Sequence, residues 1–532
     1  MSSESGARVE LPLGWENPLL AEVAQINPPL DRCVLGDGVE VNFIPMRAVE
    51  PEGGGLASPE VRCYGQVKKG YTSFLSGDII MAKITPCMEN GKTIVVPELP
   101  GSVCFGSTEF HVLRPGRGIE PRWIASFLLQ QGTRRAAQRA MTGGVGQMRV
   151  PSSFLEAIRI PLAPVRQQIR VSDEIDELFS DLDAGVAALE RVRAKLAHYR
   201  ASVLKAAVEG ALTTEWRQQH PHTEPASELL KRILVERRRR WENEQLRKFE
   251  EKGQKPPENW RAKYSNPSAP DTGILPALPE GWCWATVDQL TSLVTSGSRG
   301  WKEYYAKNGP VFIRSQDIRT DQLNLRDVAH VSPPKNSEGV RTQVRSGDLL
   351  VTITGANVAK AARVVGELSE AYVSQHVGLV RLLDPALGKF LHIYAIAPSG
   401  GRKRLLAAAY GAGKPGLNLD NLRELPVPLA PIAEQEAIID AVEDELSVME
   451  HLEDDFDAKV KSAQALRHSI LRHAFTGQLV SQDSDDEPAS ELLKRIAAER
   501  ESRACGVGGA KRAPIIMGAP RRAAGGPRRQ RK

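Results

Sequence analysis

Two long stretches of the chain alternate apolar and polar residues with the period of an α-helix. Past Pro164 no proline occurs before Pro221, and apolar residues recur in steps of three and four with one gap at Gly185. These positions are Val171, Ile175, Leu178, Leu182, Leu189, Val192, Leu196, Tyr199 and Val203. A looser series lies between Pro431 and Gly477, at Ile438, Val442, Met449, Leu452, Phe456, Ala463, Leu466 and Ile470. Such spacing is typical of a heptad seam, so two long amphipathic helices are predicted.

Each predicted helix follows a long region with a different pattern. Short aliphatic and β-branched runs, punctuated by Gly, Pro and Asn, predict strands and turns there. The runs are DIIMAKIT, TIVV and EFHVL in the first region, and VFIR, DLLVTIT and GLVRLL in the second. Residues Trp123 to Arg139 predict a helix. Each region is therefore expected to be a mixed α/β domain, in which the Ser-Gly-Asp before an aliphatic run forms a turn that leads into a strand.

The two halves of the chain are copies of one another. LPLGW at 11–15 returns as LPEGW at 278–282, and IPLAPVRQQ at 160–168 returns as VPLAPIAEQ at 427–435, both after 267 residues. SVLKAAVEGALT from Ser202 returns with the same offset as SILRHAFTGQLV from Ser469. EPASELLKRI occurs twice without change, at 224–233 and 487–496. Repeats this far apart indicate a tandem duplication of a whole domain and its helix, not a solenoid.

The repeats divide the chain into seven predicted segments. They are a first globular domain (1–163), its long helix (164–212), a basic helical and Pro-rich connector (213–277), a second globular domain (278–430), its long helix (431–480), a short helix that repeats the connector motif (481–502) and a basic tail (503–532). The tail has too few apolar residues to pack, so we expect it to be disordered.

An apolar seam of this length must be covered by another part of the protein. A helix of about 45 residues is about 65 Å long at 1.5 Å per residue, longer than a globular domain of this size is wide. Its apolar seam would face water unless another helix covered it, and the seam of the other copy is the economical partner. We therefore predict an antiparallel coiled coil between the copies. The alternative is that each helix packs along its own globular domain.

Composition excludes several classes of protein. No stretch has the roughly 18 consecutive apolar residues of a membrane helix, and the start lacks a signal peptide, so we expect a cytoplasmic protein without a membrane. The six cysteines are scattered, without metal-ligand spacing, and we expect free thiols. The net charge is +5, but 62 basic and 65 acidic residues remain when the eight basic residues of 511–532 are set aside. Nucleic-acid binding would therefore need basic residues gathered on one surface.

Both globular regions contain residues able to contact DNA bases or phosphates. Arg, Lys, Asn and Gln read base edges, and phosphate contacts set position. The candidates in the first region are Lys68, Lys69, Lys83, Lys92, Arg139, Gln147 and Arg149, and those in the second are Arg299, Lys302, Arg314, Lys360, Arg363, Arg404 and Lys414. The basic run 237–240 in the connector is open to two interpretations, a solvated helix face or a site for phosphate or a partner.

Catalytic motifs in the chain are incomplete. Asn27-Pro28-Pro29-Leu30 resembles the Asn-Pro-Pro-aromatic signature of amino-methyltransferases, but Leu30 replaces the aromatic residue and no Gly-rich methyl-donor motif accompanies it. The run 78–83 lacks the second carboxylate that metal-assisted hydrolysis requires. The Gly-rich run 411–416 lacks the spacing of a phosphate-binding loop. We interpret the first as a turn, the second as a strand, and expect no catalytic residue and no metal site.

The LPxGW openings, the GDII and GDLL strands and especially VPLAPIAEQEAII at 427–439 resemble the specificity subunits of type I restriction-modification enzymes. The resemblance covers most of residues 11 to 480. The first copy departs from the family's lead-in to the long helix, because Gln167 stands where the second copy has Glu434. Pro161, Pro164 and the heptads persist in that copy.

The resemblance implies two target recognition domains, joined by an antiparallel coiled coil with pseudo-twofold symmetry, that read a bipartite target in double-stranded DNA. Two methyltransferase subunits and restriction helicase-nuclease subunits would assemble on it, and S-adenosylmethionine, ATP and Mg would bind only in those partners. The chain itself would be non-catalytic. Two alternatives remain, a coiled-coil adaptor without direct DNA reading and a DNA methyltransferase in its own right.

Overall fold

The computed structural model describes residues 11–30, 35–100, 103–144, 146–297, 299–319, 321–333, 337–366, 368–411 and 413–505. It forms two compact units. Unit 1 comprises Met1–Ala188 and Ala458–Lys532, and unit 2 comprises Leu189–Asp457. We call the globular part of unit 1, residues 11–163, head 1, and that of unit 2, residues 278–430, head 2. The predicted disordered tail lies almost wholly outside the described residues.

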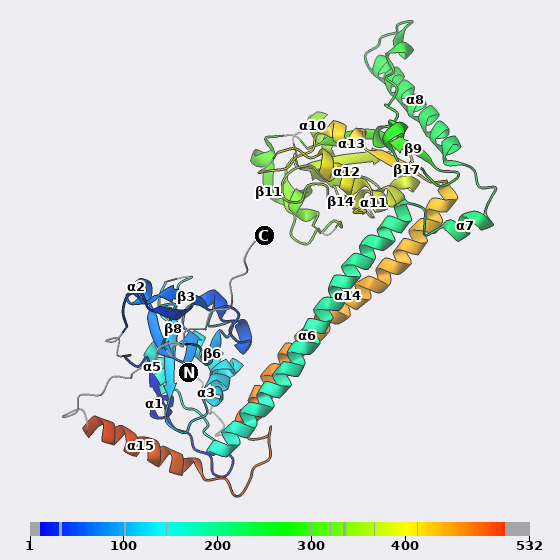
Figure 1. The fold of residues 1–532 in the computed structure, drawn as a ribbon. Coiled ribbons are helices and arrows are strands. Elements are labelled where there is room, and N and C mark those ends of the chain that lie inside the picture. The colour runs from blue at the N-terminus through cyan, green and yellow to red at the C-terminus, as the bar shows by residue number, and fades with distance from the viewer. Residues whose placement is uncertain are drawn as a thin grey trace, which may run out of the picture. The chain divides into compact units, whose positions relative to one another are not determined.

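Head 1 is built on two four-stranded sheets (Figure 1). The first has the order β1-β8-β5-β6 and is antiparallel throughout. The second has the order β3-β2-β7-β4, with β2 and β7 parallel. The strands are β1 (Ala24–Ile26), β2 (Glu40–Ile44), β3 (Glu60–Cys63), β4 (Thr72–Leu75), β5 (Ile79–Ala82), β6 (Thr93–Val95), β7 (Val103–Gly106) and β8 (Phe110–Pro115).

Head 2 repeats this plan. The sheet β10-β16-β13-β14 corresponds to the first sheet of head 1, and β12-β11-β15, again with one parallel pair, corresponds to the second. A third, two-stranded sheet pairs β17 with β9. The strands are β9 (Cys283–Thr286), β10 (Thr291–Ser296), β11 (Tyr305–Ile313), β12 (Ala329–Val331), β13 (Leu349–Thr352), β14 (Ala361–Arg363), β15 (Ala371–Val373), β16 (Val377–Leu382) and β17 (Pro426–Leu429). The expected mixed α/β heads are confirmed.

The Ser-Gly-Asp sequence forms the same turn in both heads. Asp78 accepts a hydrogen bond from the backbone N–H of Leu75 at 2.8 Å and is bound in a bidentate fashion by Arg114 of β8, at 2.8 and 2.7 Å. Asp348 is bound by Arg381 of β16 at the same two distances. Both carboxylates are almost wholly buried. The aspartate of the motif therefore fixes the turn to a neighbouring strand.

The short helices of head 1 differ from the prediction in one place. Trp123 to Arg139 was expected to be one helix, but the chain forms α3 (Pro121–Leu129) and α4 (Gln131–Arg139). Gln130 separates them with an extended ψ of 136°. Trp123 and the apolar residues of α3 are buried in the core, whereas α4 is mostly polar. The break lets the chain turn where the apolar pattern ends.

The two predicted long helices are α6 (Val165–Val208) and α14 (Ile432–Phe475), of 44 residues each. Each follows a Pro-Leu-Ala-Pro segment, and each ends before a glycine in the left-handed region, Gly210 at φ 72° and Gly477 at φ 71°. Only glycine adopts this conformation without strain, so it closes both helices in the same way.

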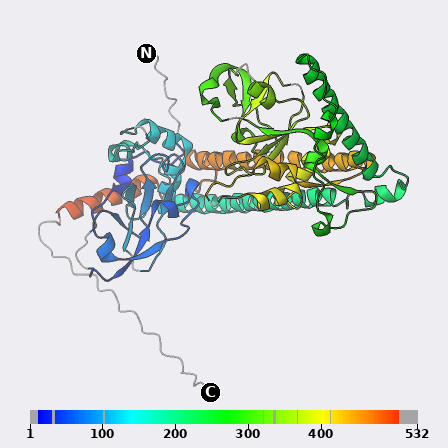
Figure 2. The same cartoon turned by 90° about the horizontal axis from the view of Figure 1, so that it is seen from above.

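Within each unit α6 and α14 lie side by side and run antiparallel (Figure 1 and Figure 2). In unit 1 Arg467 of α14 forms an ion pair with Asp183 of α6. In unit 2 Arg193 pairs with Asp457 at 3.2 Å, and the Tyr199 hydroxyl donates to Glu445 at 3.1 Å. Residue numbers rise on α6 as those of their partners fall on α14, which confirms the antiparallel coiled coil.

The predicted seam is not covered along its whole length. Val171 and Ile175 are buried in unit 1, and Val203 is buried in unit 2. Val192 and Tyr199 are 43% and 49% exposed, although both belong to the heptad pattern. A single partner helix covers only part of an apolar face, so the middle of α6 keeps apolar surface in contact with water.

The two EPASELLKRI segments begin the helices α8 (Ala226–Glu251) and α15 (Ala489–Cys505). Each packs on the head of the other copy. Leu229 and Ile233 of α8 belong to the core of unit 2, whereas Leu492 and Ile496 of α15 belong to the core of unit 1. The sequence predicted these helices but not their packing partners.

Candidate nucleic-acid interface

Each head carries a glycine loop, which we define as residues 142–149 in head 1 and 410–416 in head 2. The ends of the first loop pair with each other, because the N–H of Thr142 donates to the carbonyl of Arg149 at 3.0 Å and the reverse bond is 2.8 Å. The loop is fixed to the segment after β5, where Thr85 N–H donates to the Met148 carbonyl at 3.0 Å and Val150 N–H to the Lys83 carbonyl at 2.9 Å.

The loop of head 2 is fixed by the equivalent bonds. Tyr410 and Gly416 exchange N–H to carbonyl bonds of 3.0 and 2.9 Å. Gly355 N–H donates to the Pro415 carbonyl at 2.9 Å, and Leu417 N–H to the Ile353 carbonyl at 2.8 Å. The backbone thus presents an exposed loop at the same edge of both heads, whatever side chains the loop carries.

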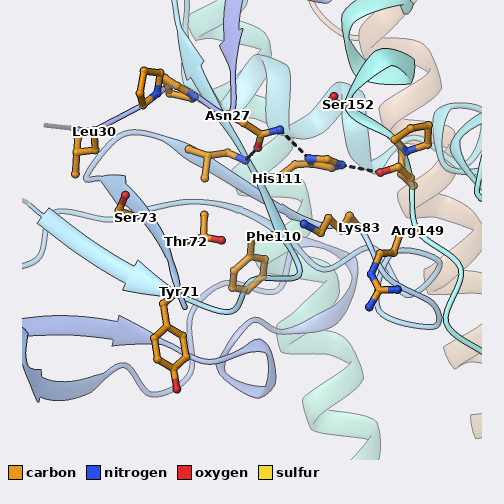
Figure 3. Close-up of a pocket in the computed structure, with 15 residues that line it drawn as sticks. Asn27, Leu30, Tyr71, Thr72, Ser73, Lys83, Phe110, His111, Arg149 and Ser152 are labelled. Carbon is orange, nitrogen blue, oxygen red and sulfur yellow. Dashed lines mark hydrogen bonds between the residues drawn. The ribbon is translucent and has the colours of Figure 1, made fainter. Parts of the chain in front are cut away.

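A cavity of about 630 Å³ opens beside the loop of head 1 (Figure 3). Three segments line it, the chain after β1, the start of β4, and the strand ends next to the loop. The lining residues are Asn27, Pro28, Pro29, Leu30, Tyr71, Thr72, Ser73, Lys83, Phe110, His111, Val112, Arg149, Val150, Pro151 and Ser152. The cavity therefore combines aromatic and small polar side chains with two cations.

The two cations of this cavity differ in their partners. Arg149 forms a bidentate ion pair with Glu109 at 2.8 and 2.9 Å. The hydrogen bond from Arg149 lowers the pKa of the Glu109 carboxyl, which stays ionised. Lys83 lies near Glu109 and His111, and in the described part of the chain no carboxylate forms an ion pair with it. Lys83 is thus the cation with donors left for a ligand.

Asn27 and His111 form the floor of the cavity. The Asn27 amide donates to His111 Nδ1 at 3.1 Å and accepts from the backbone N–H of Val112 at 3.0 Å. His111 Nε2 then donates to the carbonyl of Val150 at 2.8 Å. Burial lowers the pKa of His111, which favours the neutral ring. Both the nitrogen and the oxygen of the Asn27 side-chain amide form hydrogen bonds within head 1. This agrees with a turn at Asn-Pro-Pro.

Head 2 has different side chains at the equivalent positions. Gly378 replaces His111, and a Cβ atom there would meet Leu422 at 2.6 Å and Ile353, the equivalent of Lys83, at 3.2 Å. Apolar side chains therefore fill the space that is open in head 1. Lys414 is exposed in the loop, and its charge adds to burial in lowering the pKa of His376. This edge combines Lys414 with His376.

The structure gathers only some of the predicted candidates. Lys83, Gln147 and Arg149 come together in head 1, and Lys414 occupies the equivalent loop of head 2. Lys69 and Arg299 are exposed elsewhere on their heads, Arg363 lines another pocket of unit 2, and the Lys302 side chain lies outside the described residues.

The remaining candidates bind groups of the protein itself. Lys68 pairs with Asp37 at 2.7 Å, and Arg314 pairs with Asp317 at 3.1 Å. Lys92, Arg139 and Lys360 donate to backbone carbonyls, and Arg404 lies over the ring of Trp284. Sequence reasoning missed Glu109 and His111, which orient and line the edge of head 1.

The basic run in α8 is neutralised along the helix. Arg237 pairs with Asp288 at 3.1 Å and Arg238 with Glu242 at 3.1 Å. Arg239 and Arg240 both pair with Glu236. These contacts favour the interpretation of a solvated helix face over a phosphate site.

No group of three or more metal-ligating side chains occurs in the described ranges. Over the same residues, no helix is both long and apolar enough to cross a membrane. The described cysteines Cys63, Cys87, Cys104 and Cys283 are free thiols.

Known proteins resemble this chain along most of its length. It is 29% identical over 512 residues to the EcoEI type I restriction enzyme specificity subunit of Escherichia coli, covering 87% of this chain and 82% of that protein. It is 28% identical to the EcoAI specificity subunit of Escherichia coli, covering 83% and 79%. The chain is thus similar to type I restriction enzyme specificity subunits over most of its length. A match of this extent reaches into both heads and both long helices.

The fold agrees with that of a solved chain. A chain solved in a study of complex assembly and conformational transition of the type I R-M system aligns with a TM-score of 0.59 at 18% identity. The alignment covers 88% of this chain and all of that chain. No family model matches the sequence.

Proposed function

We propose that this chain is the sequence-specific DNA-binding subunit of a type I restriction-modification complex, and that each head reads one half of a bipartite target. The observation that carries the proposal concerns the glycine loop, which occurs at the same place in both heads. Both heads hold an exposed glycine loop by the same backbone hydrogen bonds, and the side chains on and beside it differ. The relatives, named as type I restriction enzyme specificity subunits, support the same function.

The chemistry of the edges suits DNA. Lys83 and Gln147 in head 1 and Lys414 in head 2 are able to donate to base edges or phosphates, and Arg149 is already oriented by Glu109. Different side chains on an equivalent backbone allow two unlike half-sites to be read in the same manner. This difference is what a bipartite, non-palindromic target requires.

We also propose that the chain is non-catalytic. S-adenosylmethionine, ATP and Mg would bind in two methyltransferase subunits and in the restriction helicase-nuclease subunits, and the complex would act in the cytoplasm. Apolar side chains on the long helices support docking of the methyltransferases there, since Val192, Tyr199, Val448 and Leu466 are 43–59% exposed. Purified chain should transfer no methyl group and cut no DNA; methylation by the chain alone would contradict this.

Matched single substitutions test the two-head proposal. Lys83→Ala in head 1 and Lys414→Ala in head 2 are compared by profiling methylated sites in the assembled complex. A lost base contact costs about 1–3 kcal/mol and relaxes one position, whereas a lost phosphate contact weakens all sites and lowers the salt slope by about one. We expect each variant either to relax the sequence preference in its own half-site alone, as a lost base contact does, or to weaken all sites alike, as a lost phosphate contact does. Arg239→Ala, on a neutralised helix face, is the control and should change neither.

An exchange of the whole of head 1 gives a second readout. Replacing residues 11–158 with the same region of a relative should change one half-site and keep the other. A change in both halves, or unchanged binding in the Lys83 and Lys414 variants, would favour the adaptor without direct DNA reading.

The sequence also predicts that helix length sets the gap between half-sites. Inserting one heptad into a long helix adds about 10.5 Å at 1.5 Å per residue, or up to about three base pairs of B-DNA. A three-residue insertion turns the following residues off the packed face and should impair assembly instead. An unchanged gap in a fully active heptad variant would show that the helices do not set the spacing.

A further inference from the structure

Each unit contains a junction where the tryptophan of LPxGW meets the first turn of a long helix. We define junction 1 by Trp15, Gln167 of α6, and the tail of α14, residues 477–488. Junction 2 consists of Trp282, Glu434 of α14, and the tail of α6, residues 210–225. Each tail leads into one of the identical EPASELLKRI helices.

The two junctions share a common frame. The indole Nε1 of Trp15 donates to Gln167 at 3.0 Å, and that of Trp282 donates to Glu434 at 2.8 Å. The first N–H of each docking helix donates to the glycine of LPxGW, Ala489 to Gly14 at 2.9 Å and Ala226 to Gly281 at 2.8 Å. Nothing in this frame distinguishes one EPASELLKRI helix from the other.

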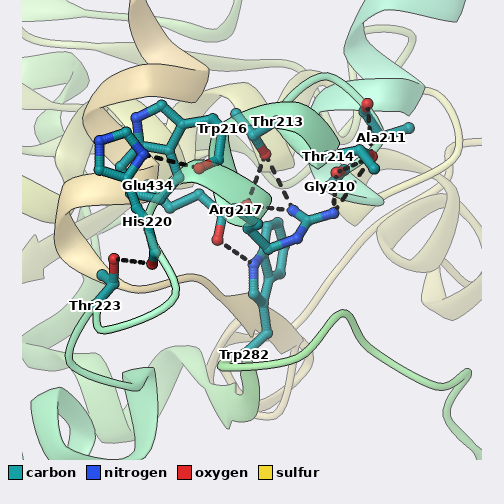
Figure 4. Close-up of polar contacts among 10 residues, drawn as sticks. All are labelled: Gly210, Ala211, Thr213, Thr214, Trp216, Arg217, His220, Thr223, Trp282 and Glu434. Atoms are coloured by element: carbon teal, nitrogen blue, oxygen red, sulfur yellow. Dashed lines mark hydrogen bonds and ion pairs between the residues drawn. The ribbon is translucent and has the colours of Figure 1, made fainter.

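Junction 2 is built around a buried anion (Figure 4). The Glu434 side chain is 1% exposed. Besides Trp282 it accepts a hydrogen bond from the Thr213 hydroxyl at 2.6 Å and forms an ion pair with Arg217. Arg217 also donates to the carbonyl of Gly210, where α6 ends, at 2.7 Å. The α6 tail therefore brings the cation that this head requires.

Junction 1 has the opposite arrangement. Gln167 is neutral, and its Nε2 has no hydrogen-bond partner among the described residues. The buried anion belongs to the tail instead. Asp486, whose side chain is 2% exposed, is bound in a bidentate fashion by Arg170 of α6 at 2.6 and 3.2 Å. Asp483 adds negative charge to the same tail.

We propose that these opposite charges assign each tail to the head of the unlike copy, and that they prevent pairing of like copies from two chains. If copy one paired with copy one of a second chain, the α6 tail would bring Arg217 to Gln167 and Arg170. If copy two paired with copy two, the α14 tail would bring Asp486 to Glu434. Both encounters bring like charges together, and the second places two carboxylates in a buried site. Such repulsion disfavours the wrong pairing.

The surface that each tail recognises is therefore the first turn of a long helix with its LPxGW loop. The pairing that this recognition prevents is with a second copy of this chain. Sequence identity in EPASELLKRI makes this exclusion necessary, because the docking helices themselves fit either head. The charge difference is also the reason for the departure at Gln167. A carboxylate there would face the acidic tail, whose Asp486 already binds Arg170.

The test exchanges the charges between junctions in the full chain. A head exchange, Q167E with R170A, E434Q and A437R, gives each head the residues that the other head has at the equivalent positions. A tail exchange replaces residues 211–223 with 478–486 and the reverse. Each exchange alone now matches like copies, so we expect a doubling of mass in light scattering. We also expect about tenfold faster hydrogen exchange at the amides of Ala226 and Ala489.

The two exchanges together restore both matches. We expect the combined variant to return to the mass and the exchange rates of the wild type, because only complementarity between head and tail matters. A purely structural role of each residue would give damage that adds up in the combined variant. Additive loss, failure of the combined variant to fold, or unchanged mass and exchange in both separate exchanges would each overturn the proposal.

Discussion

Heads 1 and 2 share a buried ion pair that stabilises each fold, but they differ in the side chains beside the glycine loop. Asp78 with Arg114 in head 1 and Asp348 with Arg381 in head 2 form the same buried pair. At the edge, Lys83 and His111 of head 1 correspond to Ile353 and Gly378 of head 2, and a cavity in one is filled in the other.

The difference teaches which positions the fold constrains. Removing one partner of a buried ion pair is strongly destabilising, and both copies keep this pair. A side chain at the rim of a loop contributes little to stability, because the loop is held by its backbone. The edge is therefore free to diverge, and the recognition of two unlike half-sites becomes possible on one scaffold.

The largest effect is expected from removing the shared turn. Asp78→Ala should lower the free energy of unfolding of unit 1 by about 3 kcal/mol, since it leaves a guanidinium without its partner, and Asp348→Ala should do the same in unit 2. Hydrogen exchange in β5 and β13 measures the two units separately. Asp37→Ala, which removes an exposed ion pair, is the control and should change stability by less than about 1 kcal/mol. Clearly unequal losses in the two units would break the equivalence of the heads.

A smaller effect is expected from adding a side chain at Gly378 of head 2. Gly378→Ala places a Cβ atom 2.6 Å from Leu422, and overpacking of this kind costs about 1–3 kcal/mol. Leu422→Ala in the same chain should recover part of that loss. Thermal unfolding and exchange in β16 provide the measurement. A neutral Gly378→Ala would mean that the filled edge of head 2 is as open as that of head 1.

The smallest effect is the part of the acid dependence of head 1 that comes from His111. Burial holds the pKa of His111 below its usual 6.5, so the unfolded chain binds a proton first as the pH falls. Unit 1 should lose stability as the pH drops through 6.5, and protonation of Nδ1 would also break the bond from Asn27. His111→Asn should reduce this loss between pH 7 and 5, measured by exchange in β8. Exchange in β16 is the internal control, because the acid dependence that His376 and His392 give unit 2 should be the same in wild type and variant. Equal acid loss in β8 of wild type and variant would contradict the assignment.

The sequence predicted the long helices well because their signal is local. Heptads and bounding prolines lie within each segment, and α6 and α14 begin one residue after the second proline of their Pro-Leu-Ala-Pro segments. The packing of α8 and α15 was not predictable in the same way. Their apolar residues show that these helices are covered on one side, but the covering surface is contributed by residues far away in the chain.

The candidate site was less predictable for the same reason. Lys68 and Lys83 were both candidates by residue type, yet Lys68 forms an ion pair with Asp37 and Lys83 forms none in the described ranges. The partner of Lys68 is 31 residues away. Glycine spacing at 142–149 and 410–416 was the signal that could have located the edge, since it marks exposed loops in both copies.

The division of the chain into units has a consequence for synthesis on the ribosome. Unit 2 is one continuous stretch, Leu189–Asp457, whereas unit 1 is assembled from both ends of the chain. The helix that carries Ala489 is synthesised after the whole of unit 2. Unit 2 therefore completes its contacts before the segment that closes junction 1 has been made. A nascent chain whose emerged part ends between residues 458 and 476 would present a complete second unit and an open first one.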